Sequence, residues 1–135
     1  MRTAIDTSVL LDLLTGDPVH AAASEGALRR VAREGALLVC ECVLAEIGPS
    51  FARDDEVAEF IADLELQFVP STRESALLAG TMFRSFLARR QAPGQRRVVT
   101  DFLIGAHARV HADRLLARDR GYYRDYFKGL TLLAP

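Results

Sequence analysis

The sequence has few cysteines and no long apolar run. Cys40 and Cys42 are too few for a disulfide scaffold, and as alternate residues of an extended segment their Cα atoms would lie about 6 to 7 Å apart, which suits a disulfide poorly. No stretch approaches the roughly 18 apolar residues of a membrane span, and the start lacks the pattern of a targeting segment. We therefore expect reduced thiols, no membrane contact and a cytoplasmic protein.

Positive net charge is also missing. The formal net charge is -1, so binding to a nucleic acid would require a local basic patch. Lys128 is the only lysine, and every other cationic side chain is an arginine, whose guanidinium suits forked phosphate contacts. The alternative for these arginines is an ordinary solvated face. The basic clusters comprise Arg89, Arg90 and Arg124 together with the four weak candidates for RNA binding, Arg96, Arg97, Arg118 and Arg120.

The remaining composition is that of an ordinary folded protein. Half of the 135 residues are hydrophobic and 26% are charged, which fits a single domain over residues 1–135. Short apolar runs alternate with helical patterns, as expected for an α/β fold with a parallel sheet. The predicted strands are 3–6, 36–40, 67–69, 115–116 and 130–133, and the predicted helices are 9–14, 20–34, 43–47, 54–64, 73–90 and 101–111.

Local signals set several helix ends. Asp6-Thr7-Ser8 is predicted to cap the first helix, and Thr100 the helix over 101–111. Gly48-Pro49 should interrupt the chain directly after the helix that carries Glu46. The aromatic stretch from Tyr122 to Phe127 is assigned no regular structure.

Four acidic residues follow strand-like runs or fall within apolar helices, namely Asp6, Glu46, Asp101 and Asp119. In open α/β sheets ligands bind beyond the carboxyl ends of the strands, so we expect these side chains to meet there. Four carboxylates together repel one another unless a cation neutralises them, and oxygen ligands favour Mg²⁺ or Mn²⁺ over zinc. The sequence therefore predicts a metal site suited to phosphodiester hydrolysis, in which Thr7 or Ser8 orients a water or a ligand.

Each of these residues has a simpler interpretation. A single aspartate after a strand is often only a cap or a solvated turn residue. Glu46 and Asp101 argue against that for the set, because an unpaired acid inside an apolar helix is costly. His107 and His111 have the spacing of a metal pair, but His107 lies about 240° around the helix from Asp101, which favours a packed or surface pair. Tyr122 and Tyr123 are more typical of core residues than of base-stacking residues.

Four motifs together carry a family pattern over nearly the full length. They are AIDTSVL over 4–10, LAE over 44–46, TDFLIGAHA over 100–108 and LLARD over 115–119, the last followed by Tyr123 and Phe127. In these motifs the sequence resembles PIN-domain proteins, specifically the VapC toxins of type II toxin-antitoxin pairs. The resemblance implies a three-layer α/β/α fold with a short parallel sheet of four to five strands. The sequence departs from the family at Ala117, where a threonine is common.

The resemblance also implies an activity and partners. The chain would be an endoribonuclease with Mg²⁺ or Mn²⁺ held by Asp6, Glu46, Asp101 and Asp119, and Ser8 would occupy the small-hydroxyl position. It would form a homodimer and be inhibited by a small antitoxin whose extended tail covers the acidic pocket. Two alternatives stay open: a PIN scaffold that binds RNA or protein without cutting, and a metal-dependent phosphatase. The RNA target, the cleavage position, the antitoxin and the number of ions are not set by the sequence.

Overall fold

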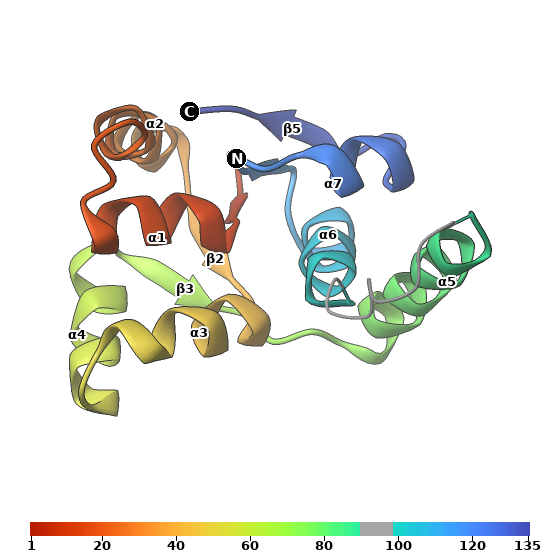
Figure 1. Cartoon of the computed structure of the whole chain (residues 1–135), viewed down its shortest axis with the longest axis horizontal. Coiled ribbons are helices and arrows are strands. Elements are labelled where there is room, and N and C mark those ends of the chain that lie inside the picture. The colour runs from red at the N-terminus through yellow and green to blue at the C-terminus, as the bar shows by residue number, and fades with distance from the viewer. Residues whose placement is uncertain (90–98) are drawn as a thin grey trace.

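A short parallel sheet forms the centre of the molecule. The computed structural model describes residues 1–89 and 99–135, and Figure 1 shows their arrangement. Within these residues the five strands lie in the order β3-β2-β1-β4-β5, and every neighbouring pair is parallel. This confirms the predicted α/β class and the short parallel sheet. The strands are β1 (Thr3–Ile5), β2 (Leu37–Val39), β3 (Leu66–Phe68), β4 (Arg114–Leu116) and β5 (Thr131–Leu133).

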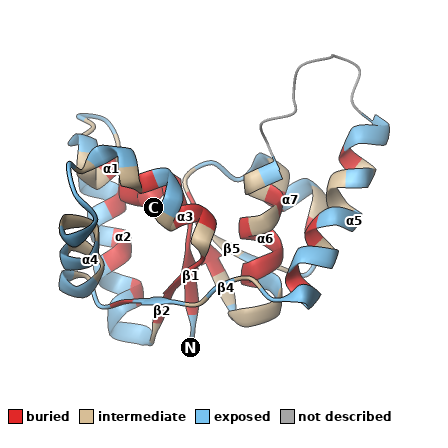
Figure 2. Cartoon of the chain, turned by 90° about the horizontal axis from the view of Figure 1, so that it is seen from below, coloured by how far each residue is buried: buried red, intermediate tan, exposed pale blue. Residues whose placement is uncertain are grey.

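Helices cover both faces of this sheet. In Figure 2 the strands run between α1, α2 and α4 on one side and α5 and α6 on the other, which is the expected three-layer arrangement. Parallel strands need crossover connections, and the helices supply them. In the described part of the chain the helices are α1 (Thr7–Thr15), α2 (Ala21–Glu34), α3 (Glu41–Ile47), α4 (Asp54–Asp63), α5 (Arg73–Arg89), α6 (Val99–His111) and α7 (Gly121–Tyr126).

The core lies between the sheet and the two helix layers. The central strands β1, β2 and β4 are buried on both sides, which explains why they read as continuous apolar runs and not as alternating ones. On the α6 side Phe102 is fully buried and packs against the rings of Phe83, Phe86 and Tyr122. This packing holds α6 against α5 and α7 and fixes the helix end that carries Asp101.

The helix ends follow most of the sequence signals. Asp6 caps α1 by accepting a hydrogen bond from the backbone N–H of Ser8, as predicted. The helix α3 ends at Ile47 and a 3₁₀ turn over Gly48–Ser50 follows, so the predicted interruption is confirmed. No helix among the described residues is long and apolar enough to span a membrane.

Two sequence predictions about local structure are wrong. Thr100 is not the N-cap of α6, because the helix already includes Val99 and Thr100 therefore lies within its first turn. The chain from Gly121 to Tyr126 forms α7, where no helix was predicted. Glycine is a poor helix former and tyrosine a modest one, and α7 is stabilised by tertiary packing of Tyr123 and Phe127, both buried.

Candidate functional site

An open cleft lies at the carboxyl ends of the central strands. Its volume is about 550 Å³, and β1 and β4, the neighbouring strands at its floor, lead directly into it. The chain leaves β1 for one direction of the sheet and β4 for the other, and such a switch point is where open α/β sheets bind ligands. The cleft is lined by Asp6, Thr7, Ser8, Leu11, Glu46, Asp101, Arg118, Asp119, Gly121, Tyr122, Tyr123 and Asp125.

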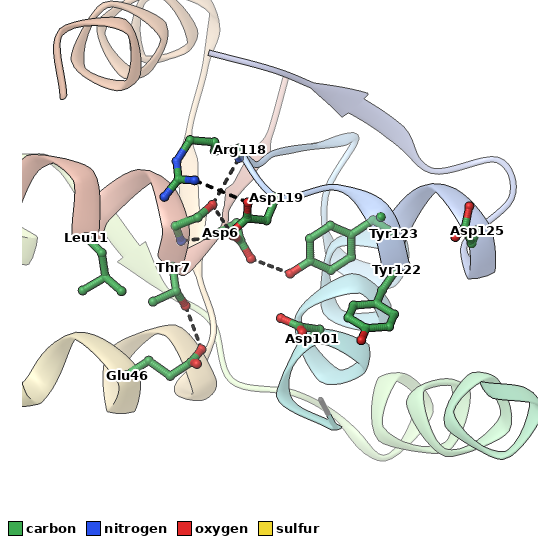
Figure 3. Close-up of a pocket in the computed structure, with 12 residues that line it drawn as sticks. Asp6, Thr7, Leu11, Glu46, Asp101, Arg118, Asp119, Tyr122, Tyr123 and Asp125 are labelled. Carbon is green, nitrogen blue, oxygen red and sulfur yellow. Dashed lines mark hydrogen bonds and ion pairs between the residues drawn. The ribbon is translucent and has the colours of Figure 1, made fainter. Parts of the chain in front are cut away.

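Asp6 is the most enclosed carboxylate of the cleft. It follows β1 directly and its side chain is held on both oxygens, as Figure 3 shows in part. Oδ2 accepts hydrogen bonds from the Ser8 backbone N–H at 3.0 Å and from the Ser8 hydroxyl, and Oδ1 accepts one from the Tyr123 hydroxyl. Only 4% of Asp6 is exposed, and burial raises its pKa although the Ser8 and Tyr123 hydrogen bonds oppose that shift.

Asp101 lies in the first turn of α6 and faces the same cleft from the other helix layer (Figure 3). Burial, with smaller contributions from the charges of Asp6, Glu46 and Asp119, raises its pKa to about 6. No hydrogen bond or ion pair to Asp101 is found among the described residues. Its ionised form therefore has the least local compensation in the cleft.

Glu46 and Asp119 complete the acidic set from more exposed positions. Glu46 extends from α3, and its Oε1 accepts a hydrogen bond of 2.8 Å from the Thr7 hydroxyl at the start of α1. Asp119 lies between β4 and α7, and its side chain is 78% exposed. The structure thus brings together in one cleft all four carboxylates singled out in the sequence, with Thr7 and Ser8 beside them. Their roles remain predictions.

The donor set suits a hard divalent cation in its chemistry. Carboxylate oxygens are the ligands that Mg²⁺ and Mn²⁺ prefer, and a cation would relieve the repulsion that contributes to the raised pKa of Asp101. Within residues 1–89 and 99–135, however, no three acidic, histidine or cysteine side chains are grouped closely enough to hold an ion as they stand. The residues present therefore fit such an ion by type, but they form no closed ligand group.

The arginines proposed for RNA binding differ in their surroundings. Arg118 lines the cleft, but its guanidinium is paired with the buried Asp12 at 2.9 Å and contacts Asp119 at 3.4 Å. Arg120 is exposed beside the cleft at the start of α7. Arg90, Arg96 and Arg97 lie outside the described residues. An RNA contact therefore remains a prediction for each candidate, and Arg118 has a structural partner that the sequence did not reveal.

Three residues in or beside the site, Tyr123, Asp125 and Asp12, were given no role there from the sequence. Tyr123 was considered a core or stacking residue, and it is buried with its hydroxyl donating to Asp6. Asp125 lines the cleft but lies apart from the other acids in Figure 3 and pairs with Arg124. Asp12 was not singled out at all. Only its apolar helical surroundings, in which an acid is unusual, could have drawn attention to it.

The histidines and cysteines lie elsewhere. His107 and His111 are absent from the cleft lining and form a packed pair with ring centroids 5.0 Å apart, and His107 is 1% exposed. Burial lowers the pKa of His107, as expected for an imidazole removed from water. Cys40 and Cys42 are both free and buried, in agreement with the expectation of reduced thiols.

Solved structures with the same fold are toxin-antitoxin complexes. The VapBC2 complex of Rickettsia felis, bound to a DNA fragment from its promoter, matches at a TM-score of 0.73 and 15% identity, covering 100% of this chain and 99% of that one. VapBC-1 of nontypeable Haemophilus influenzae matches at 0.70 and 14%, with 99% and 98% covered. A toxin-antitoxin complex of Klebsiella pneumoniae matches at 0.66 and 16%, with 97% and 95% covered.

At these identities the structures establish the fold alone. No curated protein matches the chain by sequence. The family model of the PIN domain matches residues 3–128, which is nearly the entire chain and includes all four acidic residues of the cleft. The chain therefore belongs to the PIN domain family.

Proposed function

We propose that the chain is a metal-dependent endoribonuclease of the VapC type, in which Asp6, Glu46, Asp101 and Asp119 hold Mg²⁺ or Mn²⁺. One observation carries this proposal: carboxylates from four separate segments of a PIN domain line one open cleft at the carboxyl ends of the central strands. Like charges gathered in one cleft repel one another unless a cation binds among them.

The neighbouring side chains prepare these carboxylates for a ligand. Ser8 and Tyr123 hold both oxygens of Asp6, and Thr7 holds Glu46, so the acids keep fixed orientations before anything binds. A bound divalent cation would supply a water activated for attack on phosphorus and would neutralise the charge of the transition state. Asp101, whose pKa is about 6, is partly protonated near neutral pH until a cation binds.

The proposed substrate is an RNA strand. The cleft is open and about 550 Å³ in volume, so a phosphodiester backbone can reach its floor without a prior opening step. Arg120 is exposed beside the acids, and we propose it as a phosphate contact together with Arg96, Arg97 and, more weakly, Arg118. These cations would offset the repulsion between an acidic cleft and a polyanion.

The proposed partners follow from the same relatives. Because the matching structures are toxin-antitoxin complexes, we propose that this chain is the toxin of such a pair, inhibited by a small antitoxin that covers the acidic cleft. We also propose a homodimer that acts in the cytoplasm. The non-catalytic scaffold and the phosphatase are the competing functions.

The test is cleavage of a mixed RNA pool by the purified protein. Reactions with Mg²⁺, Mn²⁺ or a chelator are compared for the wild type, Asp6→Asn and Asp101→Asn. Asp63→Asn is the matched control, since Asp63 is an exposed aspartate at the end of α4, outside the cleft. Cuts that need metal, Asp6 and Asp101, but not Asp63, would support the proposal.

The other outcomes distinguish the competing functions. A folded protein that binds Mn²⁺ and RNA without cutting would support the scaffold. Hydrolysis of a small phosphate ester without hydrolysis of RNA would support the phosphatase. Full activity of either cleft variant would contradict the assigned ligands.

A further inference from the structure

A second buried carboxylate lies just outside the cleft. Asp12, on α1, is 2% exposed, and its Oδ2 accepts a hydrogen bond of 2.7 Å from the hydroxyl of Ser24 on α2. Arg118 reaches it from the segment after β4 and makes a forked contact, with Nε to Oδ2 at 2.9 Å and Nη2 to Oδ1 at 2.9 Å. Forked, charge-assisted pairs of this kind are among the stronger hydrogen-bonded contacts in proteins.

Arg118 also borders the acidic cleft. Its Nη1 lies 3.4 Å from Oδ1 of Asp119, a long contact compared with the fork to Asp12. Its backbone N–H donates to the Ser8 hydroxyl at 3.1 Å, and that hydroxyl in turn donates to Asp6. Figure 3 shows the guanidinium of Arg118 at the edge of the set of cleft carboxylates, with Asp119 and Asp6 close by.

An arginine in this position has two competing sets of partners. One is the single carboxylate of Asp12. The other is the set of cleft carboxylates, which together carry more negative charge and so attract a cation from several directions. A guanidinium that moved into the cleft would neutralise the same oxygens that a divalent ion needs. The fork to Asp12 and the support of Asp12 by Ser24 favour the first arrangement.

From this geometry we propose that Asp12 is a positioning residue that keeps Arg118 at the edge of the cleft. There its guanidinium has only the long contact to Asp119 among the described cleft carboxylates, and Asp6, Glu46 and Asp101 stay free for a divalent cation. The inference rests on the metal site of the proposed function. In this role Asp12 restrains Arg118 beside the site. The role also explains why Asp12 is buried at a position that does not line the cleft.

The experiment measures the affinity for Mn²⁺ by electron paramagnetic resonance, so that no cleavage is needed. Asp12→Asn removes the forked anionic partner of Arg118 and leaves only the long contact to Asp119, so we expect Mn²⁺ to bind about tenfold more weakly or worse. In the double variant Asp12→Asn/Arg118→Met the released cation is gone, and we expect an affinity within about threefold of the wild type.

Two further variants separate this role from general destabilisation. Ser24→Ala removes a hydrogen bond from the same buried acid but leaves the fork intact, so it should lower the Tm while Mn²⁺ affinity stays within about twofold. Arg118→Gln removes only the cation and needs no folded Asp12→Asn protein, and it should bind Mn²⁺ as tightly as the wild type or tighter.

Three results would contradict the proposed role of Asp12, and two others would contradict the metal site itself. Wild-type affinity in Asp12→Asn, no recovery in the double variant, or a tenfold loss in Arg118→Gln would overturn the role of Asp12. If the wild type itself binds no Mn²⁺, or Asp6→Asn binds it equally well, the metal site of the proposed function fails instead.

Discussion

Two buried aspartates only six positions apart behave in opposite ways. Asp6 and Asp12 are 4% and 2% exposed, so both lie almost fully out of water. Burial raises the pKa of Asp6 above its usual value. Burial acts on Asp12 in the same direction, but hydrogen bonds from Arg118 and Ser24 outweigh it and hold the pKa below its usual value.

The difference lies in the partners and not in the burial. Asp12 has an arginine fork, whereas the only hydrogen bonds that Asp6 receives among the described residues come from neutral donors, and other carboxylates lie nearby. A buried acid with a counterion stabilises the folded chain in its ionised form. A buried acid beside other acids destabilises it and is typical of a site that binds a ligand. We therefore expect the proposed cation to bind at Asp6 and Asp101, and not at Asp12.

The largest expected effect is on cleavage. Asp101→Asn removes a charge from the cleft but no core volume, so we expect the single-turnover rate of RNA cleavage to fall about 100-fold or more with the far-ultraviolet circular dichroism unchanged. Asp63→Asn should cleave at the wild-type rate. A rate within about threefold of the wild type in Asp101→Asn would show that the least compensated acid is not part of the reaction.

The next effect separates the two aspartates by stability. Asp12→Asn removes the forked partner of Arg118 and should lower the free energy of unfolding by about 2 to 3 kcal/mol. This is less than for a fully buried pair because Arg118 is 30% exposed. Asp6→Asn should change it by no more than about 1 kcal/mol without metal, because an amide keeps most of the hydrogen bonds. Urea denaturation followed by circular dichroism measures both. Equal losses would remove the distinction between the two sites.

Metal should stabilise only the protein with an intact cleft. Mg²⁺ at about ten times its dissociation constant should add about 1.4 kcal/mol to the stability of the wild type and raise the Tm by about 5 °C. Asp6→Asn should show little of this increase, whereas Ser24→Ala, which alters only the neighbourhood of Asp12, should keep it. An equal increase in wild type and Asp6→Asn would indicate that Mg²⁺ binds elsewhere.

The smallest effect is a dependence on pH. Because the pKa of Asp101 is about 6 in the folded chain and near 4 in the unfolded one, the folded state binds more protons between these values. Stability without metal should therefore fall as the pH rises through this window. After allowance for solvent screening, the loss relative to Asp101→Asn should be about 1 kcal/mol. Denaturation of both proteins at pH 4 and pH 7 measures this difference. An equal change of stability with pH in the wild type and Asp101→Asn would contradict the prediction.

The sequence predicted the parts of the site that depend on local pattern. Asp6 follows an apolar strand and precedes a helix, and the parallel sheet then places it opposite the segment of Asp119. Glu46 and Asp101 stood out because acids are unusual within apolar helices. The strand and helix signals were therefore sufficient to gather these four residues, although not to show their contacts.

The contacts themselves depend on distant parts of the chain. Asp12 and Arg118 are 106 positions apart, and Tyr123 and Asp6 are 117 apart, so no local spacing could reveal either pair. The helix α7 was missed for a related reason, since its short segment is held by the burial of Tyr123 and Phe127 and not by helix propensity. Long-range partners, more than element types, limited the prediction of the site.

The most direct test is the pKa of Asp101, measured from its side-chain carboxyl carbon by nuclear magnetic resonance with and without Mg²⁺. We predict titration near pH 6 without metal and a clear shift to lower pH when Mg²⁺ binds, because the cation favours the ionised acid. Titration near the usual value of an aspartate in both conditions, or near pH 6 with no response to Mg²⁺, would contradict a cation site in the cleft.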